Sequence, residues 1–236
     1  MLIVEDRPSD SPYVERVWRA HSEGGGSFLS VAEYRSELVV TRHQGRVTVT
    51  VRGPETRVSR LSYPPDAQWR GIRLKPGAFL PSLPGRELVD GDVTLPNAMN
   101  ASFWLDGSAW QVPDYENADT FVAWLVGAGL LVIDPAVPAA LRGELTDASL
   151  RTVQRRFLHA TGVTRGAARQ IERARYATLL LKRGDSIADV TYAAGYFDQP
   201  HMTRALKRLI GQTPAELRDG SEELSFMYKT EPLATP

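Results

Sequence analysis

Residues 149–217 contain one local pattern twice, a short helix that can cap itself and that has one polar side. The copies cover residues 149–157 and 198–208, and Ser149 and Asp198 can each offer a side-chain oxygen to the unpaired N–H groups of a first helical turn. Apolar residues recur on one side of each expected helix, and Arg, Gln, Thr or Lys occupy the other. Such polar side chains contact base edges and phosphates in a major groove. The pattern therefore predicts a DNA-binding protein with two reading helices.

The second copy has the anatomy of a complete helix-turn-helix unit. Ser186 and Asp189 are spaced as a capping box, which predicts the start of a helix. Gly195 then provides the permissive backbone that a tight turn requires. Pro200 lies in the first turn of the next helix, where a missing N–H costs nothing, and Gly211 ends that helix. Helix, glycine turn and basic amphipathic helix follow each other as in a helix-turn-helix motif.

This region resembles the signature of AraC/XylS-type transcription regulators over roughly residues 139–218. The matching residues are DSIADV at 185–190, AGYFDQ at 194–199, His201, Thr203, Arg204, Lys207, Arg208 and GQTPAE at 211–216. The resemblance implies two helix-turn-helix units of homeodomain-like fold, joined by one long helix. It also implies an N-terminal cupin-like barrel that binds a small effector, dimerises, or does both, and contact with RNA polymerase if the protein is an activator.

The segment between the two units independently predicts a long linker helix. Residues 167–183 contain no Pro or Gly, and Ile171, Ala174 and Leu181 recur at helical spacing. About 17 residues at a rise of 1.5 Å give a rod of roughly 25 Å. Such a spacer could hold the reading helices about one repeat of DNA apart, roughly 34 Å.

The first unit departs from the family pattern. Its leading helix is expected around residues 137–145, but Thr-Asp-Ala at 146–148 replaces the usual alanine and glycine turn. Arg165 stands where a proline is usual, and Ala168 where an aromatic residue is usual.

Eight residues match the DNA-facing positions of the family: Arg151, Thr152, Arg155, Gln199, His201, Thr203, Arg204 and Lys207. Arg155 and Arg204 can each form two hydrogen bonds to guanine, and Gln199 can do so to adenine. Thr203 and Lys207 are expected to hold phosphates. The alternative is that these residues form ordinary solvated helix faces.

Charge is segregated along the chain. The whole sequence is neutral, with 28 basic and 28 acidic residues. Residues 139–219 contain 14 Lys or Arg and 8 Asp or Glu, a net charge of +6, so the remainder has a net charge of −6. A neutral protein should bind random DNA weakly, so specificity must come from placed contacts and from copies acting together.

Composition limits the cellular setting. The longest apolar stretch, residues 121–133, contains two glycines and is too short to span a bilayer. Residues 1–7 include acids where a signal peptide would have basic residues. The chain has no cysteine, which excludes disulfides, thiolate nucleophiles and cysteine-based zinc sites. We expect a cytoplasmic, nucleoid-associated protein with no membrane partner.

An enzymatic function is not expected. A cupin-type metal centre needs two or three histidines and a carboxylate, but only His21 and His43 lie in the N-terminal half, without a close motif. The glycines at 24–26 lack the Lys-Ser/Thr of a phosphate-binding loop, and no nucleophile-elbow or dinucleotide fingerprint occurs. The sequence therefore predicts no catalytic residues, cofactor or metal.

The N-terminal half predicts short β-strands. Residues 31–40, 46–51, 57–63 and 69–75 are rich in β-branched and aromatic types, with Gly and Pro between them. The predicted fold class is α+β with two domains, a mainly-β small barrel or sandwich followed by an all-α double helix-turn-helix. The predicted parts are a β domain at 1–115, a helix and linker at 116–138, the DNA-binding domain at 139–219 and a tail at 220–236.

The sequence of the β domain is compatible with more than one role. An effector pocket for an aromatic or anionic molecule could be lined by Trp18, His43, Trp69, Arg73 and Trp104. The alternative is that the tryptophans are core residues. Phe121, Trp124 and Leu125 could pair with their copies in a homodimer. Two hypotheses therefore remain, a regulator that senses a small effector, and a DNA-binding protein whose N-terminal domain serves only dimerisation or protein contact.

Overall fold

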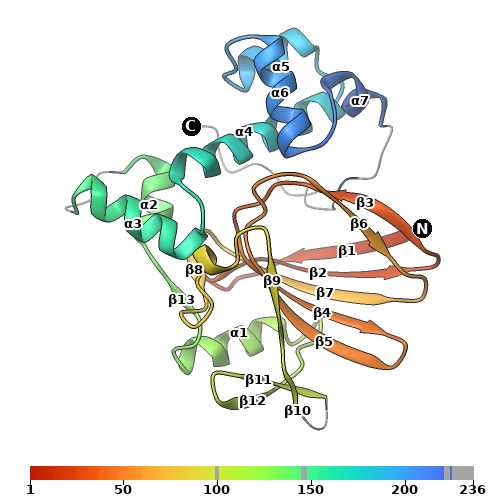
Figure 1. Cartoon of the computed structure of the whole chain (residues 1–236), viewed down its shortest axis with the longest axis vertical. Helices are drawn as coiled ribbons and strands as arrows, with labels where there is room; N and C mark the ends of the chain where they lie inside the picture. The colour runs from red at the N-terminus through yellow and green to blue at the C-terminus, as the bar shows by residue number, and fades with distance from the viewer. Residues whose placement is uncertain (99–100, 145–147, 221–223, 225–236) are drawn as a thin grey trace. The chain divides into compact units, whose positions relative to one another are not determined.

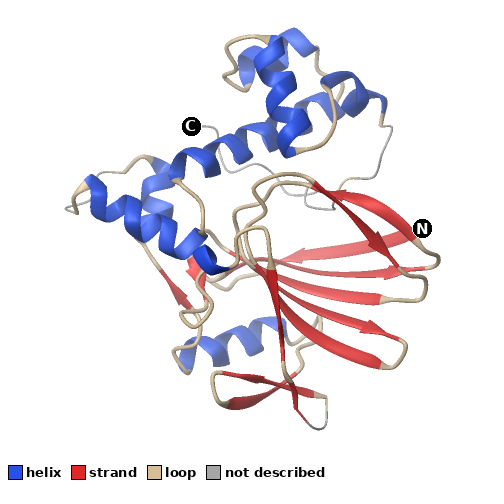
Figure 2. Cartoon of the chain, viewed as in Figure 1, coloured by secondary structure: helices blue, strands red, loops and turns tan. Residues whose placement is uncertain are grey.

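A computed structural model of the chain describes residues 1–98, 101–144, 148–220 and 224 (Figure 1). By its internal contacts the chain forms two compact units. The first comprises Met1–Gly26, Tyr34–Pro54 and Tyr63–Arg165, and the second comprises Ser27–Glu33, Glu55–Ser62 and Gly166–Pro236. Strands dominate the N-terminal half of the sequence and helices the C-terminal half, which confirms the predicted fold class (Figure 2).

The first unit is built on a six-stranded antiparallel sheet. Its strands, in spatial order, are β1 (Leu2–Pro8), β2 (Val14–Ser22), β7 (Gln68–Leu74), β4 (Glu37–His43), β5 (Arg46–Arg52) and β9 (Asp92–Leu95). Along β5, Val49 and Val51 are buried while Thr48 and Thr50 are partly exposed. This alternation follows from the two-residue period of a strand with one face on a core.

Shorter elements complete the core of this unit. They are β8 (Ala78–Phe79), the 3-10 helix η1 (Gly85–Glu87), β10 (Asn97–Ala98), β11 (Ser102–Leu105), β12 (Ser108–Gln111), α1 (Ala118–Gly127) and β13 (Val132–Ile133). Phe121 of α1 makes edge-to-face contacts with Phe103 and Trp110. Phe121 and Leu125 are both buried, whereas Trp124 is exposed. The predicted pairing of all three with a second copy is therefore wrong for Phe121 and Leu125, because α1 uses that side to cover its own core.

The first helix-turn-helix unit lies within the same compact unit. It consists of α2 (Ala136–Arg142) and α3 (Leu150–Thr161). The leading helix is shorter than the expected 137–145, since Gly143 adopts a left-handed conformation with φ of 74° and ends it. Two of the three residues expected in the turn at 146–148, namely 146 and 147, lie outside the described residues.

The second compact unit contains α4 (Arg165–Lys182) from its second residue onward, α5 (Ile187–Ala193), α6 (Gln199–Leu209) and α7 (Pro214–Asp219). The predicted linker helix is confirmed as α4, whose buried residues include Ile171, Ala174 and Leu181. The unit also takes in most of β3 (Gly26–Ser30) and β6 (Ser59–Tyr63), which pair with each other. These two strands come from the N-terminal half of the sequence. The predicted boundaries at 115, 138 and 219 stay a prediction.

The residues that the structure describes include no candidate membrane span and no candidate metal cluster. None of their helices is both long and apolar enough to cross a bilayer. No group of three or more His, Cys, Asp or Glu side chains in these ranges could hold a metal ion.

Candidate nucleic-acid interface

The second helix-turn-helix unit has the predicted N-cap residues and turn, but Asp189 bonds to the Ser186 hydroxyl where a capping box has a bond to the amide. Ser186 Oγ accepts a hydrogen bond from the Asp189 amide at 3.1 Å and donates one to the Asp189 carboxylate at 2.6 Å. Gly195 has φ of 66°, a left-handed conformation that glycine adopts without strain. Asp198 caps α6 by accepting from the His201 amide at 2.7 Å. The local sequence therefore sets both ends of the turn that presents α6.

Helix α6 has a buried face and an exposed polar face. Met202, Leu206 and Leu209 are buried in the unit. Three of the predicted DNA-contacting residues lie exposed on the other side: Gln199, Arg204 and Lys207. This face can enter a major groove without unpacking the helix, because none of its three polar side chains belongs to the core.

Two other predicted contact residues have local partners. His201 is half-buried, and its ring meets the Tyr196 ring edge-on at 5.3 Å. Thr203 Oγ donates to the Gln199 carbonyl one turn earlier at 2.9 Å. The structure thus places both beside the exposed face, where they also stabilise the helix and its turn.

The linker helix supports this turn, a role that the sequence reasoning missed. Arg173 of α4 donates to the Gly195 carbonyl at 3.2 Å, and its guanidinium lies 4.4 Å from the centroid of the Tyr196 ring. Burial raises the pKa of the Tyr196 hydroxyl.

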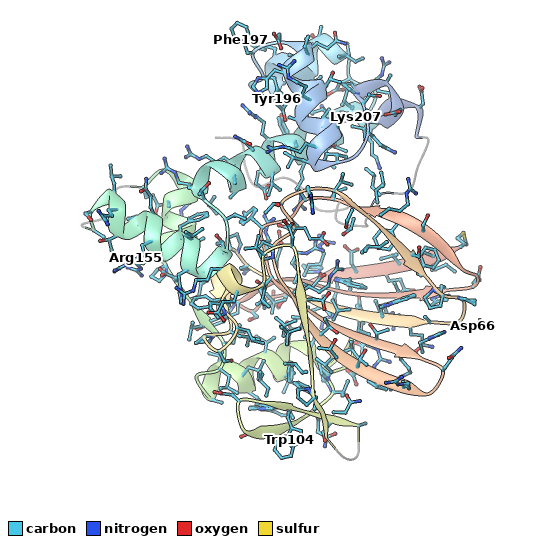
Figure 3. All side chains as sticks on the ribbon, viewed as in Figure 1. Asp66, Trp104, Arg155, Tyr196, Phe197 and Lys207 are labelled. Atoms are coloured by element: carbon cyan, nitrogen blue, oxygen red, sulfur yellow. The ribbon has the colours of Figure 1, made fainter. Side chains whose placement is uncertain are left out.

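The residue after Tyr196, Phe197, is almost fully exposed and points outward in Figure 3. An aromatic residue that precedes the cap of a reading helix is a signal that could have been noticed in the sequence.

Lys207 carries an intramolecular ion pair in this structure. Its Nζ lies 3.2 Å from Glu216 Oε2. Glu216 is the acid of the capping box of α7, where it accepts from the Thr213 amide at 2.6 Å. Hydrogen bonds from the Thr213 amide and hydroxyl, and then from Lys207, lower the pKa of Glu216 to about 2. A phosphate near Lys207 would therefore compete with an ionised carboxylate that stays anchored to its own helix.

The reading helix of the first unit, α3, has the predicted cap. Ser149 Oγ accepts from the Thr152 amide at 3.3 Å and lies 3.0 Å from the Thr152 hydroxyl. Arg151 and Arg155 are exposed, and Figure 3 labels Arg155 on α3. Phe157 is buried. The three predicted contact residues of this helix thus lie in its first two turns, and Arg151 and Arg155 are open to solvent.

The last turn of α3 packs closely on η1, which the sequence did not predict. A Cβ added to Gly85 would lie 2.7 Å from the Ala160 carbonyl oxygen, so the two backbones almost touch. His159 meets the Phe79 ring edge-on at 5.4 Å. Arg156 forms two hydrogen bonds to Asp134, at 2.6 and 2.9 Å. The first reading helix is therefore anchored to the same compact unit as the six-stranded sheet.

The predicted effector-binding residues are only partly brought together. Trp18 Nε1 donates to Glu37 Oε1 at 2.5 Å, and Arg73 Nη2 lies 3.1 Å from the same oxygen, so these two share one buried carboxylate. Trp18 and Arg73 are themselves buried. By strand register, Trp69 and His43 lie further along the same face of the sheet, where Trp69 packs edge-on against Tyr63. Trp104 is exposed on β11 of a different sheet (Figure 3).

Comparison with known proteins bears on the helical part of the chain. Residues 144–220 match the family described as "Helix-turn-helix domain". A 95-residue stretch is 35% identical to the HTH-type transcriptional regulator RipA of Corynebacterium glutamicum, covering 39% of this chain and 29% of that protein. A crystal structure of an apo form of ToxT from Vibrio cholerae, carrying one substitution, aligns over 92% of this chain and 97% of its own, with 12% identity and a TM-score of 0.33.

The C-terminal part of the chain is therefore a helix-turn-helix domain. Within it, the signature at 185–216 resembles that of AraC/XylS-type regulators. The aligned stretch spans less than a third of the length of RipA.

Proposed function

We propose that this protein is a sequence-specific regulator of transcription that binds double-stranded DNA through its two reading helices. The exposed polar face of α6, held on a capped helix-turn-helix unit, is the observation that carries the proposal. The match of residues 144–220 to a helix-turn-helix family supports it. The net charge of +6 over residues 139–219 supports an anionic partner.

The reading helices divide their contacts between bases and backbone. In α6, Arg204 binds a guanine edge and Gln199 an adenine edge, while Thr203 and Lys207 hold phosphates and His201 supports the helix end. Phe197 supplies an apolar contact of the kind that thymine methyl groups accept. In α3 the corresponding contacts come from Arg151, Thr152 and Arg155. Two successive major-groove segments are then bound by one chain.

Substitution of two residues on α6 tests this division. Arg204→Ala should cost about 1–3 kcal/mol on the specific site and relax the preference at one base pair, because a bidentate guanine contact is lost. Lys207→Ala should weaken binding to all sequences alike and reduce the slope of log K against log salt by about 1. Fluorescence anisotropy at several salt concentrations measures both, on a duplex selected from a random library and on a random duplex.

Arg183→Ala is a matched control, because Arg183 is an exposed arginine of the same unit that pairs with Asp185 at 2.6 Å. Arg183→Ala should leave the sequence preference unchanged. Any loss of affinity should be no larger than that expected from removing one positive charge that makes no DNA contact. Equal losses on specific and random DNA for Arg204→Ala and Lys207→Ala would refute the division. Failure to select any duplex with salt-sensitive affinity would refute DNA recognition itself.

We further propose that the N-terminal half binds a small effector, with Trp18 and Arg73 in the binding region. The cluster around Glu37 supports this, because Arg73 is 2% exposed and its Nη1 has no hydrogen-bond partner among the described residues. A buried guanidinium nitrogen of this kind suits an anionic or aromatic ligand. Trp69 and His43 lie further along this face of the sheet, whereas Trp104 lies on another sheet.

The alternative is an N-terminal half that serves only dimerisation or protein contact, and exposed Trp124 on α1 favours a contact of this kind. A thermal-shift screen against a metabolite library separates the two. A compound that raises the melting temperature and changes operator affinity supports effector sensing. If saturating screens find none while sedimentation shows a dimer, the alternative holds. Homodimerisation, contact with RNA polymerase and a nucleoid location remain parts of the proposal.

A further inference from the structure

Two segments from the N-terminal half of the sequence belong to the compact unit of the second reading helix. They are residues 27–33 and 55–62, which we call the strap segments. The first connects β2 to the segment before β4, and the second connects β5 to β7. The strap segments are therefore loops of the six-stranded sheet by connectivity, yet their contacts are with the α4–α7 region.

The strap segments cap the C-terminal end of α6. Carbonyl groups in the last turn of a helix have no partner within that helix. In α6 the Leu209 carbonyl accepts from the Ala32 amide at 2.8 Å, and the Arg208 carbonyl accepts from the Val58 amide at 3.1 Å. Each strap segment thus supplies one main-chain donor to the reading helix.

Packing around Gly211 adds to this contact. Gly211 follows α6 with φ of 92°, and a Cβ built on it would lie 3.0 Å from side-chain atoms of both Leu29 and Val58. The two strap segments also hold each other, since Glu33 and Glu55 exchange main-chain hydrogen bonds at 2.9 and 2.6 Å. The end of α6 therefore rests on a paired, closely packed surface.

A buried ion pair joins the same surface to the linker helix. Arg175 of α4 donates to the Glu33 carboxylate, and both side chains are more than nine-tenths buried. A buried charge is tolerated only when it is paired and hydrogen-bonded. Because Glu33 lies next to Ala32, the ion pair and the cap of α6 hold one short segment from two sides.

We propose that the strap segments position the second reading helix for DNA binding, with Glu33 and Arg175 as the positioning pair. This inference rests on the proposed function and names residues outside the predicted DNA-contacting set. The strap segments stay docked when the protein binds its site, because they orient α6 through its own carbonyl groups. A change in the sheet strands that flank them would then reach the reading helix through main-chain hydrogen bonds.

Amide hydrogen exchange on the full wild-type chain tests whether docking accompanies binding. The Ala32 and Val58 amides should exchange slowly in the free protein and at least as slowly with a duplex selected from a random library. Faster exchange of these amides on adding the duplex would show that the strap segments are released by DNA, which overturns the proposal. Fast exchange in the free protein would overturn it as well.

Glu33→Gln tests the positioning pair, because it keeps the side-chain shape and removes the carboxylate charge to which Arg175 donates. We expect exchange of the Ala32 and Val58 amides to accelerate by about ten-fold or more. Affinity for the selected duplex should fall by about ten-fold or more, while affinity for a random duplex stays within about two-fold, since only the placed contacts depend on helix orientation. Asp185→Asn is the control, because it removes the same charge from an exposed pair of the same unit.

The outcomes separate the two proposals. Faster exchange with unchanged affinity for the selected duplex would overturn the positioning role. Equal loss of selected and random binding would show unfolding of the unit rather than loss of orientation, and would also count against it. If no duplex can be selected at all, the proposed function fails, whereas slow exchange in the free protein would still show the docked strap segments.

Discussion

Gly85→Ala is expected to lower the free energy of unfolding by about 3 kcal/mol, at the upper end of the usual cost of overpacking. The added methyl carbon would lie 2.7 Å from the carbonyl oxygen of Ala160 and the carbonyl carbon of Thr161, and 2.9 Å from the amide nitrogen of Gly162. All three are backbone atoms at the end of α3, so no side chain can rotate away. The reading helix α3 and η1 would have to move apart, because the atoms nearest to the added methyl group are backbone atoms, which cannot rotate away as a side chain can.

Urea unfolding followed by circular dichroism measures this effect. Gly91→Ala is the matched control, since a methyl group there meets only carbonyl oxygens at 3.9 Å, an ordinary contact distance. It should change stability by less than about 0.5 kcal/mol. The same low cost for Gly85→Ala would contradict the close packing of α3 on η1. We also expect Gly85→Ala to weaken specific DNA binding, because α3 would lose its anchor.

Arg175→Met should lower the free energy of unfolding by about 3–5 kcal/mol, which makes it the other large effect. The substitution removes one partner of the buried ion pair, while the Glu33 carboxylate stays buried and loses the Arg175 charge that faces it. Replacement of both partners by apolar residues removes both buried charges together. The double variant Glu33→Leu/Arg175→Met should therefore be close to wild type in stability.

The double-mutant cycle is measured by the same urea unfolding, with Arg183→Met as the control. Arg183 pairs with Asp185 on the exposed surface, where an ion pair contributes at most about 1 kcal/mol. A double variant as unstable as Arg175→Met alone would show that the cost comes from lost packing and not from the buried carboxylate that Arg175 no longer faces. A cost for Arg175→Met no larger than the control would show that the pair is not buried in solution.

Helix ends and turns in the C-terminal part could be predicted because they depend on residues close in sequence. Ser149, Ser186, Asp198 and Thr213 cap the helices that follow them, as their side chains reach only the next turn. The turn at Gly195 could be placed for the same reason, since a left-handed backbone favours glycine locally.

The N-terminal half was less predictable, because its elements depend on distant partners. The expected strand at 31–40 begins only at Glu37, since Ala32 and Glu33 bond to α6 and to the other strap segment instead. The apolar side of α1 was predicted, but not whether Phe121 and Leu125 would face a second copy or their own core. Periodicity shows that a face is apolar and leaves its partner open.

The amino-acid sequence by itself determined the helix-turn-helix signature, the polar faces of both reading helices and the linker between them, because these follow from neighbouring residues and helical spacing. Only the tertiary structure decided what holds those helices. Glu33 and Arg175 are separated by 142 positions, and the contact between Gly85 and Ala160 also joins distant parts of the chain. Such contacts form only when the whole chain packs, since no local preference favours one distant partner over another.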